Sequence, residues 1–107
     1  MANFAENLKS LPPVAHLARL ELFREGDPLP VASIENRPGQ AGSLAVYHHL
    51  VRLHGAIDAA AAQEGLDLYA EHTADARVHP GKHPNIDRLL SLVAEGGRLV
   101  AKEVPAA

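Results

Sequence analysis

The chain is short, mildly acidic and free of cysteine, and these properties exclude several classes of protein. It has 107 residues and a formal net charge of -3, so a single domain is expected over residues 1–107. Without cysteine, disulfides, thiolate chemistry and cysteine-based zinc sites are excluded. The Lys and Arg residues are scattered along the chain. No nucleic-acid partner is therefore expected, because phosphate binding needs clustered positive charge.

The composition and the distribution of apolar residues predict a globular protein of the cytoplasm. Apolar residues make up 47% of the chain and charged residues 21%, which is typical of soluble domains. The first ten residues, MANFAENLKS, do not place a basic segment before an apolar run, as a signal peptide does. No apolar stretch approaches the roughly 20 residues of a membrane-spanning helix. We therefore expect a cytoplasmic location and no membrane partner.

A short helix and a β-hairpin are predicted first. Apolar residues recur at helical spacing over 2–11 and stop at a Pro-Pro pair, which indicates a helix. Residues 17–23 alternate between apolar and polar, as a half-buried strand does. Turn residues at 25–28 then lead into a second strand over 29–35. The residues expected to face inward are Ala18, Leu20, Leu22, Ala32 and Ile34.

The first long helix is predicted to follow a Gly-rich turn. Ser43 is a favourable N-cap, and Gly55 is a favourable C-cap for a helix that ends near residue 54. On a helical wheel Leu53 belongs to the apolar face, whereas His48 points away from it.

Two further helices and a last strand are predicted in the second half of the chain. Asp58 caps a helix that is expected to continue unbroken to His79, where His-Pro-Gly ends it. Asn85 is expected to cap the next helix, which ends at Gly96. Residues 98–104 contain Val100 and Val104 and are β-branched enough to predict a last strand that could pair beside the hairpin.

The predicted fold class is α+β. A three-stranded antiparallel sheet, made of the N-terminal hairpin and the C-terminal strand, is covered on one face by three helices, and a short helix precedes it. Gly65 lies in the middle of the second long helix, where Gly costs about 1 kcal/mol relative to Ala. We interpret it as a point of close approach by a neighbouring backbone.

Histidine is abundant, and some of the histidine side chains could bind a metal. The chain has seven His residues, and a neutral imidazole is a good ligand for Zn²⁺ or another divalent ion. His72, His79 and His83 are the candidate ligands. On an ideal helix His72 and His79 lie about 10 Å apart, whereas His79 and His83 flank a turn and can converge more easily. The alternative is that these side chains only form hydrogen bonds or face solvent, since no metal-binding signature is present.

The turn before the first long helix is a candidate anion site. Backbone N–H groups and the helix dipole attract anions to a helix start. Positively charged side chains of two loops, Arg37 and Lys82, could strengthen this attraction if the loops meet. The alternative is that the glycines only form the turn and Ser43 only caps the helix. Glu35, at the strand end, is a candidate for acid–base work beside His48, His49 or Lys82. The alternative is that Glu35 faces solvent or pairs with Arg37. The candidate ligand-binding residues are Glu35, Arg37, Gly39, Gly42, Ser43 and Lys82.

Two stretches resemble a known family. Glu35 to Leu50, ENRPGQAGSLAVYHHL, and Leu68 to Leu90, which contains HPGKHPNIDRLL, resemble a small family of bacterial proteins of about this length and unknown function. The resemblance covers nearly the whole chain and implies a free-standing bacterial protein. It implies no activity.

These patterns lead to two functional hypotheses. The first is a protein that binds a small ligand, either an anion or a divalent metal, where the loops at 37–43 and 78–85 approach, because function concentrates on loops held by a scaffold. The second is a non-catalytic interaction module that forms a homodimer through an exposed sheet edge. Whether the protein is an enzyme is left open by the sequence.

Overall fold

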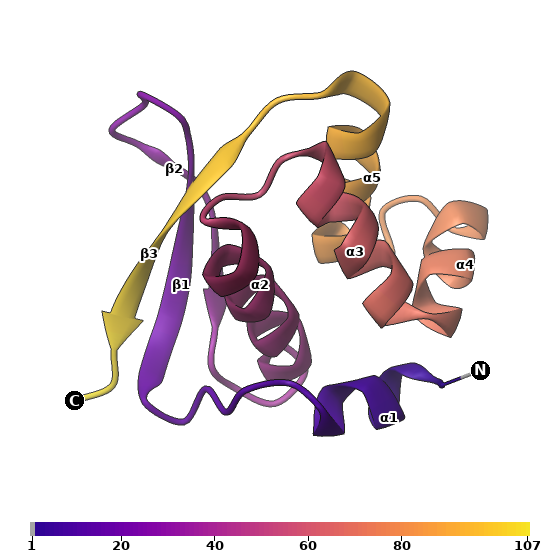
Figure 1. The fold of residues 1–107 in the computed structure, drawn as a ribbon, viewed down its shortest axis with the longest axis horizontal. Helices are drawn as coiled ribbons and strands as arrows, with labels where there is room; N and C mark the ends of the chain where they lie inside the picture. The colour runs from indigo at the N-terminus through magenta and orange to yellow at the C-terminus, as the bar shows by residue number, and fades with distance from the viewer. Residues whose placement is uncertain (1) are drawn as a thin grey trace.

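A computed structural model describes residues 2–107 of the chain (Figure 1). Among these residues no helix combines the length and the apolar character that crossing a bilayer requires. The elements in chain order are α1 (Phe4–Lys9), β1 (Leu17–Arg24), β2 (Pro30–Glu35), α2 (Ala41–His54), α3 (Ala59–Tyr69), α4 (Glu71–Val78), α5 (Pro84–Glu95) and β3 (Leu99–Pro105).

The strands form the predicted three-stranded antiparallel sheet, with β1 in the centre and the order β2-β1-β3. Leu20 of β1 lies opposite Ile34 of β2 and Glu103 of β3. Residues that lie directly opposite one another share a face of a sheet. Since Leu20 and Ile34 are both buried, the register places Glu103 on the helix-covered face of β3.

A register shift at the start of β1 changes which residue is buried there. The shift lies between Leu17 and Arg19 in the pairing of β1 with β3, and a bulge of this kind leaves one residue of the strand unpaired. Leu17 is buried as a result, and Ala18 is only partly buried. The prediction that Ala18 begins the inward face was therefore wrong, whereas Leu20 and Leu22 are fully buried as predicted.

Helix α2 lies between the sheet and the other helices (Figure 1). It packs on β1 and β2 with one side and on α3 with the other, so its buried surface is wider than a single face. His48 is consequently buried, with 1% of its surface exposed, and Leu53 is 60% exposed. Both positions contradict the sequence-based prediction, which assumed that α2 buries only one face.

The second predicted helix is divided into α3 and α4 at Ala70. The backbone of Ala70 has φ 52° and ψ −116°, which no helical residue adopts. The Thr73 hydroxyl donates a hydrogen bond of 2.6 Å to the Leu66 carbonyl across the break. Burial of this bond fixes the break, and the expectation of one unbroken helix was wrong.

Two helices begin earlier than predicted. Helix α2 begins at Ala41, and its N-cap Gln40 uses its side-chain oxygen to accept a hydrogen bond from the Glu35 amide. Helix α5 begins at Pro84, because the fixed φ of proline suits the first helical position. Ser43 and Asn85 therefore lie inside the first turns and cap neither helix.

Helix α1 is attached to the side of the helical layer. The Phe4 amide donates to the Glu71 carboxylate at 2.8 Å, and the Asn7 side chain donates to the Leu68 carbonyl at 2.9 Å. A Cβ atom at Gly42 would lie 3.3 Å from the Phe4 ring. The small size of Gly42 thus lets α1 lie against the start of α2.

Gly65 is a point of close approach, as predicted, but the approaching groups are side chains instead of a backbone. A Cβ atom at Gly65 would lie 2.7 Å from a methyl group of Leu89 on α5 and 2.8 Å from one of Leu50 on α2. Both leucines are fully buried, so neither can move into free space.

Replacement of this glycine tests how tightly the three helices pack. Gly65→Ala gains up to about 1 kcal/mol of helix propensity but overpacks the core, which typically costs about 1–3 kcal/mol. We expect a net loss in the free energy of unfolding, measured by urea denaturation. Gln63→Ala on the exposed face of the same helix is the control and should change stability by less than about 0.5 kcal/mol. A variant of Gly65 more stable than the wild type would contradict the packing.

Candidate functional site

A cavity of about 400 Å³ lies where the starts of α2 and α5 meet. Phe4 of α1 and Tyr69 of α3 contribute to its wall. The two loops proposed from the sequence, 37–43 and 78–85, therefore approach each other in space. The lining residues are Phe4, Gly39, Ala41, Gly42, Ser43, Tyr69, His72, Lys82, His83, Pro84, Asn85 and Ile86.

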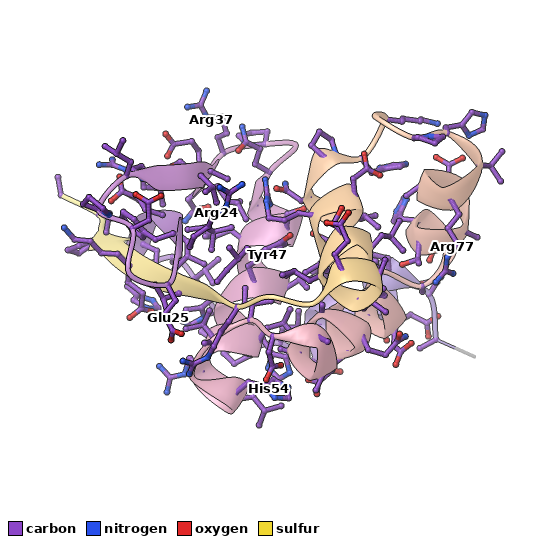
Figure 2. The ribbon with its side chains drawn as sticks, turned by 90° about the horizontal axis from the view of Figure 1, so that it is seen from above. Arg24, Glu25, Arg37, Tyr47, His54 and Arg77 are labelled. Atoms are coloured by element: carbon purple, nitrogen blue, oxygen red, sulfur yellow. The ribbon has the colours of Figure 1, made fainter. Side chains whose placement is uncertain are left out.

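The candidate ligand-binding residues divide between the cavity and its surroundings. Glu35 and Arg37 are not among the lining residues; they form an ion pair with 3.7 Å between Arg37 Nη2 and Glu35 Oε1, in which Arg37 is exposed and Glu35 is partly buried. Figure 2 shows Arg37 pointing away from the body of the molecule. The candidate residues that line the cavity are Gly39, Gly42, Ser43 and Lys82.

The start of α2 offers hydrogen-bond donors to the cavity. The Gly42 and Ser43 amides make no hydrogen bond within residues 2–107, as is usual in the first turn of a helix. The Tyr69 hydroxyl donates to the Ser43 hydroxyl oxygen at 2.7 Å, and burial raises the pKa of Tyr69, which keeps it a donor. The Ser43 hydroxyl proton is therefore free to donate elsewhere.

The start of α5 is held against α2 by Tyr47. The Tyr47 hydroxyl donates to the Asn85 carbonyl, and burial raises the pKa of Tyr47 to about 12. Arg88 donates to the Tyr47 hydroxyl at 3.1 Å and to the Asn85 side chain at 2.8 Å. In Figure 2 Tyr47 lies inside the molecule, between these helices. The two helix starts are thus fixed relative to each other.

Asp75 of α4 organises the loop that carries Lys82. It accepts hydrogen bonds from His83 Nε2 at 2.6 Å and from His79 Nδ1 at 3.2 Å, and Lys82 Nζ lies 3.0 Å away. The hydrogen bond from His83, followed by the one from Lys82, holds the pKa of Asp75 well below its usual range. Asp75 stays a carboxylate, which can only accept, so both histidines donate to it.

The three histidines proposed as metal ligands are not gathered around one point. His79 and His83 share Asp75, while the His72 ring packs against Phe4 and lies 5.8 Å from the His83 ring. In the described part of the chain, the metal-binding atoms of these three residues do not all lie within 4.8 Å of one another. The geometry therefore gives the proposed trio no support as a metal site.

Six of the seven histidines, all except His72, form three groups, each with one carboxylate. Beside the Asp75 group, Glu64 of α3 contacts His49 at 3.1 Å and His54 at 3.2 Å. In the third group His48 Nε2 lies 2.8 Å from Glu103, and the ring of His16 lies 5.6 Å from that of His48.

Only the third group, His16, His48 and Glu103, places three metal-binding atoms within 4.8 Å of one another among residues 2–107. Burial lowers the pKa of His48, against the opposing effect of Glu103. The sequence analysis missed this group. The sequence did contain one signal: His48 follows the apolar Leu44 by four residues. Residues with this spacing lie on one stripe of a helix, and the sheet covers that stripe of α2.

The fold and the cavity define a small α+β protein whose candidate site is built from two helix starts and a cationic loop. The model of one protein family, described as "Uncharacterized protein conserved in bacteria" (DUF2322), matches residues 4–103. The chain belongs to this bacterial family, as its two motifs suggested. No curated protein and no solved structure matches it significantly.

The depressed pKa of Asp75 predicts a pH dependence of stability. A carboxylate whose folded pKa is below its unfolded value of 3.8 stabilises the fold above that pH, and the stabilisation is lost as the pH falls through the folded pKa. Asp75→Asn removes this contribution. We expect its destabilisation relative to the wild type to be full at pH 6 and to shrink below pH 3.8, as measured by urea denaturation.

Asp27→Asn is the control for this experiment, because Asp27 lies in the exposed turn between β1 and β2. A destabilisation by Asp75→Asn that stays constant between pH 6 and pH 3 would contradict the ion-pair account of Asp75.

Proposed function

We propose that this protein binds a small organic anion in the cavity between the starts of α2 and α5. The observation that carries the proposal is the convergence of two helix N-termini on one cavity that also contains Lys82 and His83. The negatively charged group of the ligand would lie at the helix starts, and its apolar part would lie against the aromatic wall.

The helix starts supply a positive potential that does not depend on pH. Helices of 14 and 12 residues, α2 and α5, begin at the cavity, and each helix N-terminus carries the equivalent of roughly half a positive charge. The Gly42 and Ser43 amides point along the axis of α2 and can donate to an anionic oxygen. The start of α5 adds to this positive potential, and the Asp87 carboxylate in its first turn offsets part of the addition.

The loop between α4 and α5 supplies one cationic side chain and one imidazole. Lys82 and His83 line the cavity, whereas Asp75, which binds both, is not among the lining residues. An anion in the cavity would therefore meet Lys82 and His83 at a surface that the Asp75 carboxylate does not line. Asp75 then acts as a positioning residue, since it holds both side chains in place before the ligand binds.

The remaining wall indicates what the rest of the ligand is like. Phe4 stacks on Tyr69 with ring centroids 5.1 Å apart, and Ile86 completes the apolar part of the lining. The volume lies within the range of roughly 300–1,000 Å³ that is usual for small-molecule sites. A phosphate or carboxylate group attached to one small ring or short apolar chain fits this combination.

Binding of phenyl phosphate, measured by isothermal titration calorimetry, tests the proposal. We expect saturable binding to the wild type that is tighter than the binding of inorganic phosphate. Lys82→Gln should weaken it by about 10- to 100-fold, the range for one hydrogen bond to a charged group. Phenylacetate in place of phenyl phosphate shows whether a carboxylate group is also accepted.

Lys102→Gln is the matched control, because it removes the same charge from an exposed position of β3. It should leave the affinity within about twofold of the wild type, as a remote, screened charge does. Equal weakening by both variants, or no saturable binding by the wild type, would contradict the proposed site.

A homodimer is a second candidate role, and the free edge of β2 supports it. Leu29 directly precedes this edge strand and Val31 lies within it; they are 71% and 43% exposed. An exposed strand edge with apolar side chains can pair with another copy. Light scattering at tens of micromolar should then report a dimer that Val31→Lys converts to a monomer. A wild-type monomer at that concentration would contradict this role.

A further inference from the structure

We propose that His16, His48 and Glu103 form a binding site for one divalent transition-metal ion, with Zn²⁺ as the expected ion. The site is separate from the anion cavity and does not rest on the proposed function. It combines residues from the turn before β1, from α2 and from β3.

The first support is the composition and closeness of the group. One metal-binding atom from each of His16, His48 and Glu103 lies within 4.8 Å of the other two. Two imidazoles and one carboxylate are a donor set that zinc uses when it keeps an open coordination position. The ligand atoms of a tetrahedral zinc ion lie roughly 3.3 Å apart, from metal–ligand distances of about 2.0–2.1 Å. A small rotation of the two exposed side chains, those of His16 and Glu103, would bring the atoms to that separation.

The second support is the state of the His48 ring. His48 is 99% buried, and neither of its ring nitrogens has a hydrogen-bond partner within residues 2–107. Glu103 lies 2.8 Å from Nε2, but the approach does not have the geometry of a hydrogen bond. Buried polar atoms are nearly always paired, because leaving them unpaired costs stability. A metal ion between His48, His16 and Glu103 would give one of these two ring nitrogens a partner.

The third support is that the backbone around the site is held in place. The Asn36 side chain donates to the carbonyls of Val14 and Leu17 at 3.0 and 2.8 Å, which fixes the turn that carries His16. The Ala106 amide donates to the His16 carbonyl at 2.9 Å and ties the same turn to the end of the chain. A metal site needs ligands that are held near their final positions before the ion binds.

The direction of Glu103 is the fourth support. Its register opposite Leu20 puts it on the face that α2 covers, beside His48. An inward-facing acid on an edge strand also discourages pairing with other chains. That role requires no histidine, however, and it leaves the contact of His16 with the His48 ring unexplained.

Calorimetric titration of the untagged, metal-free full chain with Zn²⁺ tests the proposal, and Co²⁺ absorbance serves as a second readout. We expect one equivalent to bind, and Co²⁺ to develop the visible bands of a four- or five-coordinate site. His16→Ala and Glu103→Gln should each weaken Zn²⁺ binding by at least roughly tenfold, since even outer-shell changes can weaken metal binding that much. Both replaced side chains are exposed, so circular dichroism should show an intact fold.

His79→Ala is the matched control, because it removes an exposed imidazole from the Asp75 group. It should leave both the affinity and the Co²⁺ spectrum unchanged. Absence of saturable Zn²⁺ binding would overturn the proposal. So would binding that His79→Ala weakens as much as His16→Ala does, because the ion would then bind to surface histidines in general.

Discussion

The burial of α2 on two opposite sides is the constraint on which the rest of the structure depends. On one side its Val46 and Leu50 lie over Gly65, where the missing side chain lets α3 approach. On another side its Tyr47 reaches the start of α5, and His48 reaches Glu103 of β3. Because these contacts come from one rigid helix, they fix the sheet, α3 and α5 relative to each other. The anion cavity lies at the start of this helix, and the candidate metal site lies along its side.

Charged contacts extend this arrangement beyond the apolar core. Two of the three histidine groups join another element to α2: Glu64 joins the neighbouring helix α3 to the end of α2, and Glu103 joins the distant strand β3 to the middle of α2. Asp75 joins α4 to the loop before α5. Imidazole–carboxylate contacts at partly exposed positions add little stability individually. They orient side chains, however, and two of the three groups lie at a candidate site.

The extent to which the sequence predicts this structure varies with the range of the interaction. Alternation and turn residues predict the hairpin, and β-branched residues predict the C-terminal strand, because these signals are local. The break at Ala70 has no local signal, since alanine favours helix and the Thr73 hydrogen bond that fixes the break is tertiary. Pro84 was a local signal for the start of α5 that Asn85 obscured. The sequence also indicated the residues of the cavity at Gly42, Ser43 and Lys82, but only the packing of α2 and α5 on α3, with the Tyr47–Asn85 hydrogen bond, brings their loops together.

The central claim is that the position of α2 directs its first amides into a cavity that binds an anion. The most direct test is a two-dimensional ¹H–¹⁵N NMR titration of the full chain with phenyl phosphate. The account predicts the largest shifts at the amides of Gly42, Ser43 and Asn85, saturating together with a single dissociation constant. Shifts that spread over exposed Lys and Arg residues without saturation, or that leave these amides unchanged, would contradict it.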